Sequence, residues 1–245
     1  MNAHRKRVDL AAQTCLVAGL LAGYFALRRL VEGSRQDALA NADAILEVES
    51  ALGIDIERSW NSFVSDRPWL EAAFDASYVW LHWTVIATGL ATVWWRDRPA
   101  YRVLRNGLIL AAAIGILVFW RFPVAPPRTL DGYVDTVYGG GLDADLRPPG
   151  GSNVYAAMPS YHVGWPLAVT LYAATTFSSR WARAAILLPA LVLAPTVIVT
   201  ANHFVLDVVA GVGISLSCVW AAFHWEHRKR WIDAGSWAGR VRWQP

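Results

Sequence analysis

The sequence carries too little charge to cover a water-soluble domain of its size. Asp, Glu, Lys and Arg make up 17% of its 245 residues, compared with about 25% in soluble domains, while 55% are hydrophobic. The same composition excludes intrinsic disorder, and the lack of any repeat excludes collagen-like and other low-complexity classes. Cysteine is scarce too, because Cys15 and Cys218 are the two in the chain and each lies in an apolar run. That scarcity excludes a disulfide framework and a cysteine-based zinc site, so we expect an integral membrane protein.

The apolar residues are concentrated in segments close to the length of a membrane span, for which a helix needs roughly 20 mainly apolar residues. They predict an all-α fold, an integral membrane bundle of six transmembrane helices in a single membrane domain over residues 1–245. The predicted spans are 10–27, 73–95, 103–120, 161–177, 184–200 and 204–223. The domain divides into a first-span region 1–30, an outer segment 31–72, a five-helix core 73–223, in which the candidate site residues below are found, and a tail 224–245.

The first span also resembles a signal peptide, because it follows the basic His4-Arg5-Lys6-Arg7 start. Its apolar stretch is long for a signal peptide, and no clean small-x-small cleavage site precedes Arg28-Arg29. An uncleaved anchor is therefore the favoured interpretation.

The distribution of Lys and Arg predicts the orientation of the spans. Cytoplasmic loops carry an excess of these residues, and placing the N-terminus inside puts 14 of the 22 in the inner segments. We therefore expect a multi-pass protein of the cell membrane with both termini cytoplasmic. The basic, Trp-rich tail 224–245 is expected to attach to the membrane surface, and no motif supports nucleic-acid binding.

Two long segments then face outward. In residues 31–72, the apolar residues Leu39, Ala42, Ile45 and Leu46 follow helical spacing, which predicts an extra amphipathic interfacial helix on the outer membrane surface. Residues 121–160 are rich in Pro and Gly and too long for a simple connector, so we expect a lid or binding loop.

For two features of that loop we favour a structural interpretation over a functional one. The run Gly139-Gly140-Gly141 lacks the strand–loop–helix context of a nucleotide site, so chain flexibility is the better explanation. The loop's acids could bind a cation between them, but a solvated acidic loop is favoured. These acids are Asp131, Asp135, Asp143 and Asp145.

Ionisable side chains at membrane depth indicate function by default. The informative ones lie at the predicted outer ends of spans, where the topology brings them to one face: Arg121, Arg128, His162, His203 and Asp207. An active site at the extracytoplasmic face follows from this placement.

These residue types suit phosphoryl transfer through a phosphohistidine. His203 and Asp207 are four residues apart, so on a helix the carboxylate can fix the imidazole tautomer and leave the other nitrogen free to attack. His162 can protonate a leaving oxygen. The guanidinium groups of the arginines match the oxygens of a phosphate. Ser160 lies where a loop leads into a helix, so the first backbone N–H groups of that helix can face an anion.

Three blocks resemble signature motifs of the type-2 phosphatidic acid phosphatase superfamily: Arg121-x6-Arg128, Pro159-Ser160-Tyr161-His162 and His203-x-x-x-Asp207. The resemblance implies that His203 is the nucleophile, Asp207 its partner and His162 the general acid. It also implies a set of residues that bind the substrate phosphate, namely Arg121, Arg128, Ser160 and Tyr161. It implies no metal and no other cofactor, and it makes the membrane and a lipid phosphate or phospholipid the expected partners.

The sequence departs from the superfamily pattern at Thr129, where phosphatases have Pro, and at Val197, where they have a phosphate-binding Arg. The second departure is shared with the branch resembling inositol phosphorylceramide synthases, which move a phospho-headgroup between lipids. The resemblance therefore favours a phosphotransferase with an alcohol acceptor, and plain hydrolysis stays open.

Several alternatives stay open as well. His82, deeper in the second span, could contact substrate or could bond to a neighbouring helix. A zinc site made by His162, His203 and Asp207 is disfavoured, because the arginines would repel the ion. A catalytically silent lipid-binding protein and a channel or transporter are the competing classes, the latter disfavoured by the lack of repeats.

Overall fold

The computed structural model describes residues 3–139 and 153–238, which form helices and no strands. The elements in chain order are α1 (Ala3–Leu30), α2 (Arg35–Leu52), α3 (Glu57–Ser65), α4 (Pro68–Ala76), the π-helical η1 (Ser77–Leu81), α5 (His82–Arg96), α6 (Arg98–Arg121), the 3-10 turn η2 (Pro127–Thr129), α7 (Tyr161–Ala174), α8 (Arg180–Val199) and α9 (Val205–Ala238). The predicted all-α class is confirmed over this part of the chain.

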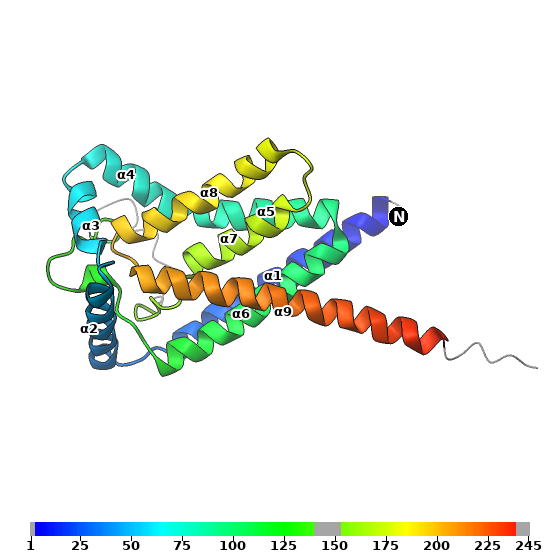
Figure 1. Cartoon of the computed structure of the whole chain (residues 1–245), viewed down its shortest axis with the longest axis horizontal. Coiled ribbons are helices and arrows are strands. Elements are labelled where there is room, and N and C mark those ends of the chain that lie inside the picture. Colours follow the sequence, from blue (N-terminus) through cyan, green and yellow to red (C-terminus); the bar gives the residue numbers. More distant parts are fainter. Residues whose placement is uncertain (1–2, 140–152, 239–245) are drawn as a thin grey trace, which may run out of the picture.

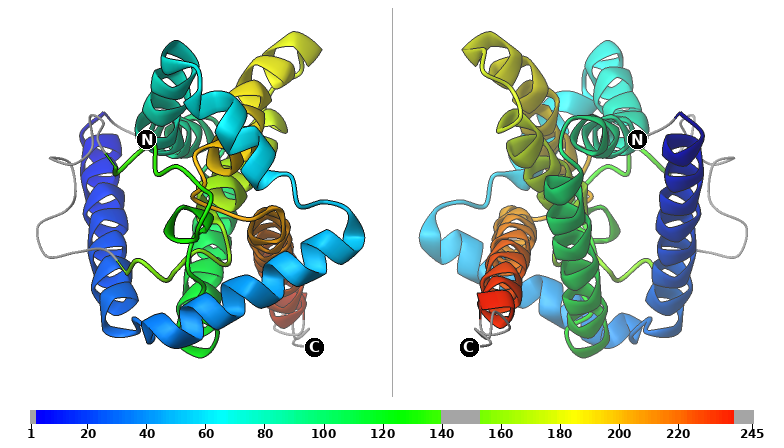
Figure 2. Two further views of the ribbon diagram at one scale, coloured as in Figure 1. Left: turned by 90° about the vertical axis from the view of Figure 1, so that its left-hand side faces the viewer. Right: turned by 90° about the vertical axis from the view of Figure 1, so that its right-hand side faces the viewer.

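The long helices of the described chain run back and forth along one axis (Figure 1). Successive elements α1, α5, α6, α7, α8 and α9 alternate in direction, and α4 continues through η1 directly into α5. Helices α2 and α3 lie across one end of the bundle, whereas the start of α1 and the end of α9 lie at the other (Figures 1 and 2).

Four helices of the described chain are long and apolar enough to cross a membrane: Val8–Leu30, Arg98–Arg121, Arg180–Val199 and Val205–Lys229. They coincide with four of the predicted spans. The predicted span 73–95 falls on the end of α4, on η1 and on α5, which follow one another without a break, and the predicted span 161–177 falls on α7, with 14 residues. At 1.5 Å per residue, a helix as short as α7 covers only about 21 Å of a hydrocarbon core about 30 Å thick.

The helix predicted from the spacing of apolar residues in 31–72 is α2. It begins after Ser34, whose Oγ accepts a hydrogen bond from the Asp37 N–H at 3.0 Å, and it ends at Gly53 with a φ of 68° that suits glycine. Its apolar stripe packs against the protein, where the prediction placed it against lipid. The buried partners of this stripe are Val124, Ala125, Ala157 and Phe204.

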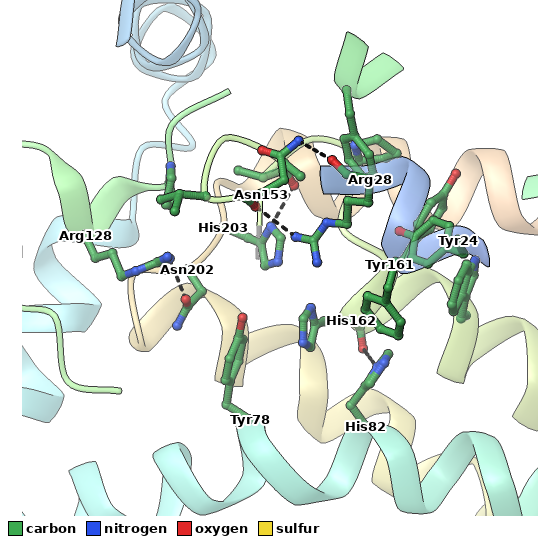
Figure 3. A pocket seen from close by; sticks show the side chains of 18 of the residues that line it. Tyr24, Arg28, Tyr78, His82, Arg128, Asn153, Tyr161, His162, Asn202 and His203 are labelled. Carbon is green, nitrogen blue, oxygen red and sulfur yellow. Dashed lines mark hydrogen bonds between the residues drawn. The ribbon is translucent and has the colours of Figure 1, made fainter. Parts of the chain in front are cut away.

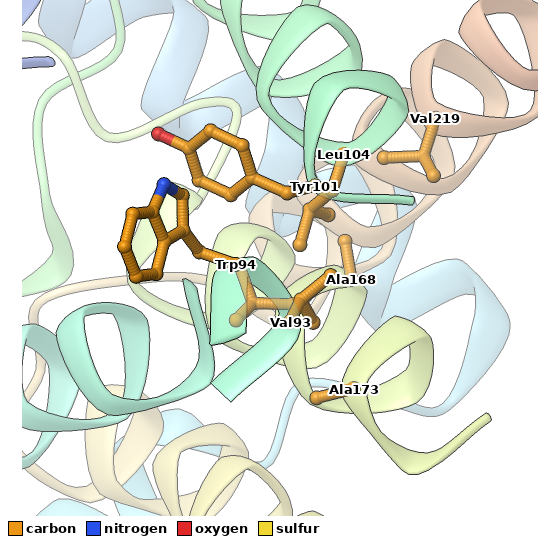
Figure 4. Close-up of a cluster of buried hydrophobic side chains, with 8 residues drawn as sticks. Val93, Trp94, Tyr101, Leu104, Ala168, Ala173 and Val219 are labelled. Carbon is orange, nitrogen blue, oxygen red and sulfur yellow. The ribbon is translucent and has the colours of Figure 1, made fainter. Parts of the chain in front are cut away.

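A second buried cluster holds the bundle together in the half that lies away from α2 (Figure 4). It joins α5, α6, α7 and α9 through Val93, Trp94, Tyr101, Leu104, Ala168, Val169, Ala173 and Val219. Apolar packing thereby fixes the helices at the end away from α2, and the polar residues of the bundle gather at the other end, beside the apolar cluster under α2.

Helices α7 and α9 touch through their backbones at that polar end. The Ser160 N–H donates to the Asp207 carbonyl at 2.9 Å. A Cβ at Gly164 would collide with the Gly211 carbonyl oxygen, and a Cβ at Gly211 would collide with the Ser160 carbonyl oxygen. Glycine is therefore required at both positions for the close approach.

Replacing Gly211 by Ala should destabilise the protein, because the new methyl group meets backbone atoms that cannot rotate away. We expect a loss of about 1–3 kcal/mol, as for overpacked cores. Gly213→Ala is the matched control, since a Cβ there meets nothing within 4 Å and alanine favours a helix by about 1 kcal/mol over glycine. Thermal unfolding in detergent checks both variants, and equal behaviour of the two would contradict the proposed contact.

Candidate active site

A polar pocket opens at the end of the bundle where α1 and α6 end and α7 and α9 begin. Its described lining includes arginines and histidines and contains no Asp or Glu (Figure 3). The basic residues are Arg28, His82, Arg128, His162 and His203. A cavity with this lining is suited to an anion.

His203 lies in the turn between α8 and α9 and is 5% exposed. Its Nδ1 is 2.8 Å from the Ala157 carbonyl oxygen. Because a carbonyl can only accept, Nδ1 carries the proton and donates, so a neutral ring keeps its lone pair on Nε2. The ring faces the pocket and points toward His162 (Figure 3).

Asp207 lies behind His203, as the four-residue spacing predicts. Its Oδ2 is 3.4 Å from His203 Nδ1 and accepts the Phe204 N–H at 2.9 Å. The Ala157 carbonyl is thus the shorter partner of the imidazole, and Asp207 supplies a fully buried carboxylate beside it. The two acceptors together fix the tautomer of His203.

The turn before His203 contains a strained residue. Ala201 has a φ of 52° and is fully buried. The Val197 carbonyl accepts the N–H groups of both Asn202 and His203 at 3.1 Å. The Ala201 carbonyl in turn accepts the Arg128 N–H at 2.8 Å, which ties the turn to the loop opposite.

Two buried acids that the sequence analysis did not identify cap the start of α9. Glu57 accepts the Val205 N–H at 2.8 Å, and Glu49 accepts the Leu206 N–H at 2.7 Å. Carboxyl oxygens are suitable acceptors at a helix N-terminus because its first N–H groups have no partner within the helix. The sequence does contain a signal for the burial of Glu49, because this residue continues the buried stripe that includes Ala42 and Ile45 at helical spacing.

His162 is the central member of a row of aromatic rings in the pocket. Its ring centroid is 5.7 Å from that of His203, 4.5 Å from that of His82 and 4.6 Å from that of Tyr78, on which it stacks. His82 Nδ1 is also 3.3 Å from the His162 carbonyl oxygen. The structure therefore brings His82, His162 and His203 together in one cavity.

Arg128 reaches the pocket from the turn η2. Its Nη1 donates to Asn202 Oδ1 at 2.6 Å, and its Nε is 3.6 Å from Asp135 Oδ2. Its guanidinium also lies over the Tyr138 ring, 4.7 Å from the centroid. Arg128 is thus held in place from several sides while it lines the cavity.

The other predicted phosphate-binding residues are placed differently. Arg121 is exposed, lies over the Trp120 ring at 4.5 Å and does not line the pocket. Ser160 is fully buried next to the pocket, and its Oγ has no hydrogen-bond partner among the described residues. Tyr161 lines the pocket with its ring, but its hydroxyl donates to the Ala111 carbonyl.

The loop 121–160 contributes walls of the pocket where it is described. Val124 and Ala156 form a bridge, and Pro126, Ala156 and Ala157 line the cavity. Gly140, Gly141, Asp143 and Asp145 lie outside the described residues. In the part of the chain that is described, no group of three or more His, Cys, Asp or Glu side chains is arranged to hold a metal ion.

Some pocket residues were not identified from the sequence: Arg28 and Tyr24 of α1, together with Tyr78, Asn153 and Asn202. Arg28 and Arg29 end the first apolar run, which is where basic residues flank any membrane anchor. Nothing in that pattern distinguishes a pocket residue from an ordinary flanking one.

Comparison with known proteins gives a family for most of the chain. A family model described as the PAP2 superfamily matches residues 43–222. No curated protein and no solved structure matches the chain. The matched residues include the turn before α9 and the loop 121–160 but not α1.

Glu49 should make the stability of the folded protein depend on pH. Burial, with a smaller contribution from the neighbouring Glu57, raises the pKa of Glu49 to about 8, whereas glutamate in an unfolded chain has a pKa of about 4.3. Between these values the folded state holds a proton that the unfolded state has lost. The free energy of unfolding therefore falls as the pH rises through this window, by up to about 1.4 kcal/mol per pH unit.

Thermal unfolding measured from about pH 5 to pH 8 tests this slope. Glu49→Gln stays neutral throughout and should flatten it, whereas Glu47→Gln, at an exposed position of the same helix, should leave it unchanged. An unaltered slope in Glu49→Gln would show that another group causes the pH dependence.

Proposed function

The chain belongs to the PAP2 superfamily, and from this premise we propose that it is a membrane-embedded phosphatase or phosphotransferase that acts through a phosphohistidine. At the level of the superfamily, its chemistry is that of a phosphatase-type enzyme with a lipid phosphate substrate. The finer proposal rests on one observation: His203 faces His162 in a pocket whose described lining is basic and free of carboxylates.

In the proposed reaction, the Nε2 lone pair of His203 attacks phosphorus and forms a P–N bond. The P–O bond to the leaving group breaks as protonated His162 gives its proton to the departing oxygen. Water or an alcohol then attacks phosphorus, His162 takes the proton of the attacking hydroxyl, and the P–N bond breaks. Asp207 and the Ala157 carbonyl stabilise the positive charge that develops on the ring of His203.

The proposed phosphate site is formed by Arg128 and the start of α7. Arg128 presents a fixed guanidinium, and Ser160 immediately precedes the first N–H groups of α7, which favour negative charge. His82 lines the same cavity and is proposed to contact substrate. Arg121 receives no role, because it lies outside the lining.

A second cavity supports a lipid as the substrate. It is almost entirely apolar and lies between α1, α5 and α6. It shares Tyr24, Trp83 and Trp165 with the polar pocket. A phosphate in the polar pocket would thus have its hydrocarbon chain in the adjoining apolar groove.

The proposed topology has six crossings, with both termini cytoplasmic and the active site at the extracytoplasmic face. The alternating direction of helices α1, α5, α6, α7, α8 and α9 supports this topology (Figure 1). The four apolar helices of the described chain support it as well. The continuous segment α4–η1–α5 and the shorter helix α7 are proposed to complete the crossings, because they lie between the four apolar helices.

Transfer to an alcohol acceptor, such as a sugar, inositol or a second lipid, is the proposed outcome, as in the inositol phosphorylceramide synthase-like branch. Val197 supports it, because its side chain is fully buried in an apolar cluster with Tyr78 and Leu193 and provides no cation. Plain hydrolysis of a lipid phosphate is the second candidate. A silent lipid-binding protein is the third, and the intact pair of His203 and Asp207 disfavours it.

The first experiment separates these candidates. Purified protein is incubated in a metal chelator with a panel of labelled lipid phosphates and phospholipids, and both free phosphate and new lipid products are followed. A product that depends on an added alcohol identifies a transferase, and phosphate release without such a product identifies a hydrolase. No turnover of any substrate would argue for the silent protein.

His203→Ala should abolish turnover, because no other residue in the proposal can form the covalent intermediate. Wild-type protein quenched during turnover should carry an acid-labile, base-stable phosphate label, and the variant should carry none. His224→Ala, at an exposed position further along α9, is the control and should keep activity and label. Full activity of folded His203→Ala would refute the mechanism.

Filling the apolar groove should affect long-chain substrates selectively. Ala112→Phe adds a ring inside the groove, and we expect KM for a long-chain lipid phosphate to rise about tenfold, as for the loss of one to two buried methylenes. The KM for a soluble aryl phosphate should stay the same. Ala113→Phe, on the exposed side of α6, should change neither, and equal effects on both substrates would contradict the groove as the chain-binding site.

A further inference from the structure

Arg28, at the end of α1, is a cation in the pocket without a compensating charge among the described residues. It forms no ion pair with any described residue, and its Nε is buried without a hydrogen-bond partner in the described chain. Its Nη2 is 3.4 Å from the Asn153 carbonyl oxygen, and its guanidinium is 5.7 Å from the Phe119 centroid. A guanidinium has five N–H donors, so most of them are left for another acceptor.

The direction of the side chain points to the ligand it would bind. Figure 3 shows the guanidinium of Arg28 extending from α1 toward the rings of His203 and His162. A cation that is partly withdrawn from water is stabilised by an anionic partner, and the described lining offers no carboxylate to pair with it. An anion held beside His203 would supply the missing charge.

The attachment of α1 to the pocket does not depend on this charge. Asn153 Nδ2 donates to the backbone carbonyl of Arg28 at 2.9 Å, and that bond persists whatever side chain stands at position 28. The long Nη2 contact of 3.4 Å adds little to it. The guanidinium is therefore not needed to hold the helix end.

We infer that Arg28 is a substrate-binding residue that contacts the phosphate oxygens opposite Arg128. The inference rests on the proposed function and extends it to α1, which lies outside the residues matched by the family. Arg128 already shares its donors with Asn202 and Asp135. The guanidinium of Arg28 makes fewer hydrogen bonds within the described chain, and its planar geometry can bind two phosphate oxygens at once.

The test compares Arg28→Ala with Arg29→Ala, a matched control because Arg29 is exposed and does not line the pocket. Turnover of a lipid phosphate and stabilisation of the protein by inorganic phosphate are measured for each. We expect Arg28→Ala to lower kcat/KM by about 10- to 100-fold, the effect of losing a charged hydrogen bond, and to lose the stabilisation by phosphate. Arg29→Ala should retain both.

Arg28→Lys is a second variant that separates loss of binding from a folding defect, because lysine keeps the positive charge but lacks the planar, two-pronged guanidinium. Intermediate turnover and phosphate binding by this variant would support the inference. Phosphate binding and turnover equal to those of Arg29→Ala in both Arg28 variants would overturn it. If wild-type protein turns over no lipid phosphate but Arg28→Ala abolishes phosphate stabilisation, the proposed function fails while the anion site at Arg28 stands.

Discussion

The site depends on the direct backbone contact between α7 and α9. The hydrogen bond from the Ser160 N–H to the Asp207 carbonyl joins the first turns of the two helices, and glycines at 164 and 211 let them approach this closely. Because His162 lies in the first turn of α7 and His203 lies two residues before α9, the contact sets the 5.7 Å separation of their rings. A wider spacing of the helices would separate the two histidines.

Acidic and basic side chains lie on opposite sides of His203. Acids lie behind it, where Glu49, Glu57 and Asp207 accept N–H groups at the start of α9. Cations lie in front, in a cavity whose described lining has no carboxylate. Each of these acids accepts a backbone N–H with one carboxyl oxygen, while its other oxygen is buried without a partner in the described chain. None of the three lines the cavity, so the cations in front stay available to an anionic ligand.

Sequence patterns predicted the features that depend on local spacing. They did not predict which side chains enter the pocket, because this depends on how each helix is rotated about its axis. The four-residue spacing of His203 and Asp207 implied their contact, and apolar runs implied the four long helices. Arg28 and Arg121 both end apolar runs, yet α1 turns the first into the pocket and α6 turns the second outward over Trp120. That rotation is set by packing between helices, which a single sequence does not encode locally.

Ala201 shows how the turn before His203 is made rigid. A left-handed conformation costs an alanine about 1–2 kcal/mol relative to its usual regions, so the turn keeps a φ of 52° only because its surroundings enforce it. The bonds that do so run to Val197 and Arg128. Relaxing the alanine would break several of them together. His203 is therefore preorganised, and the entropy of fixing its ring is lost when the chain folds, before any substrate arrives.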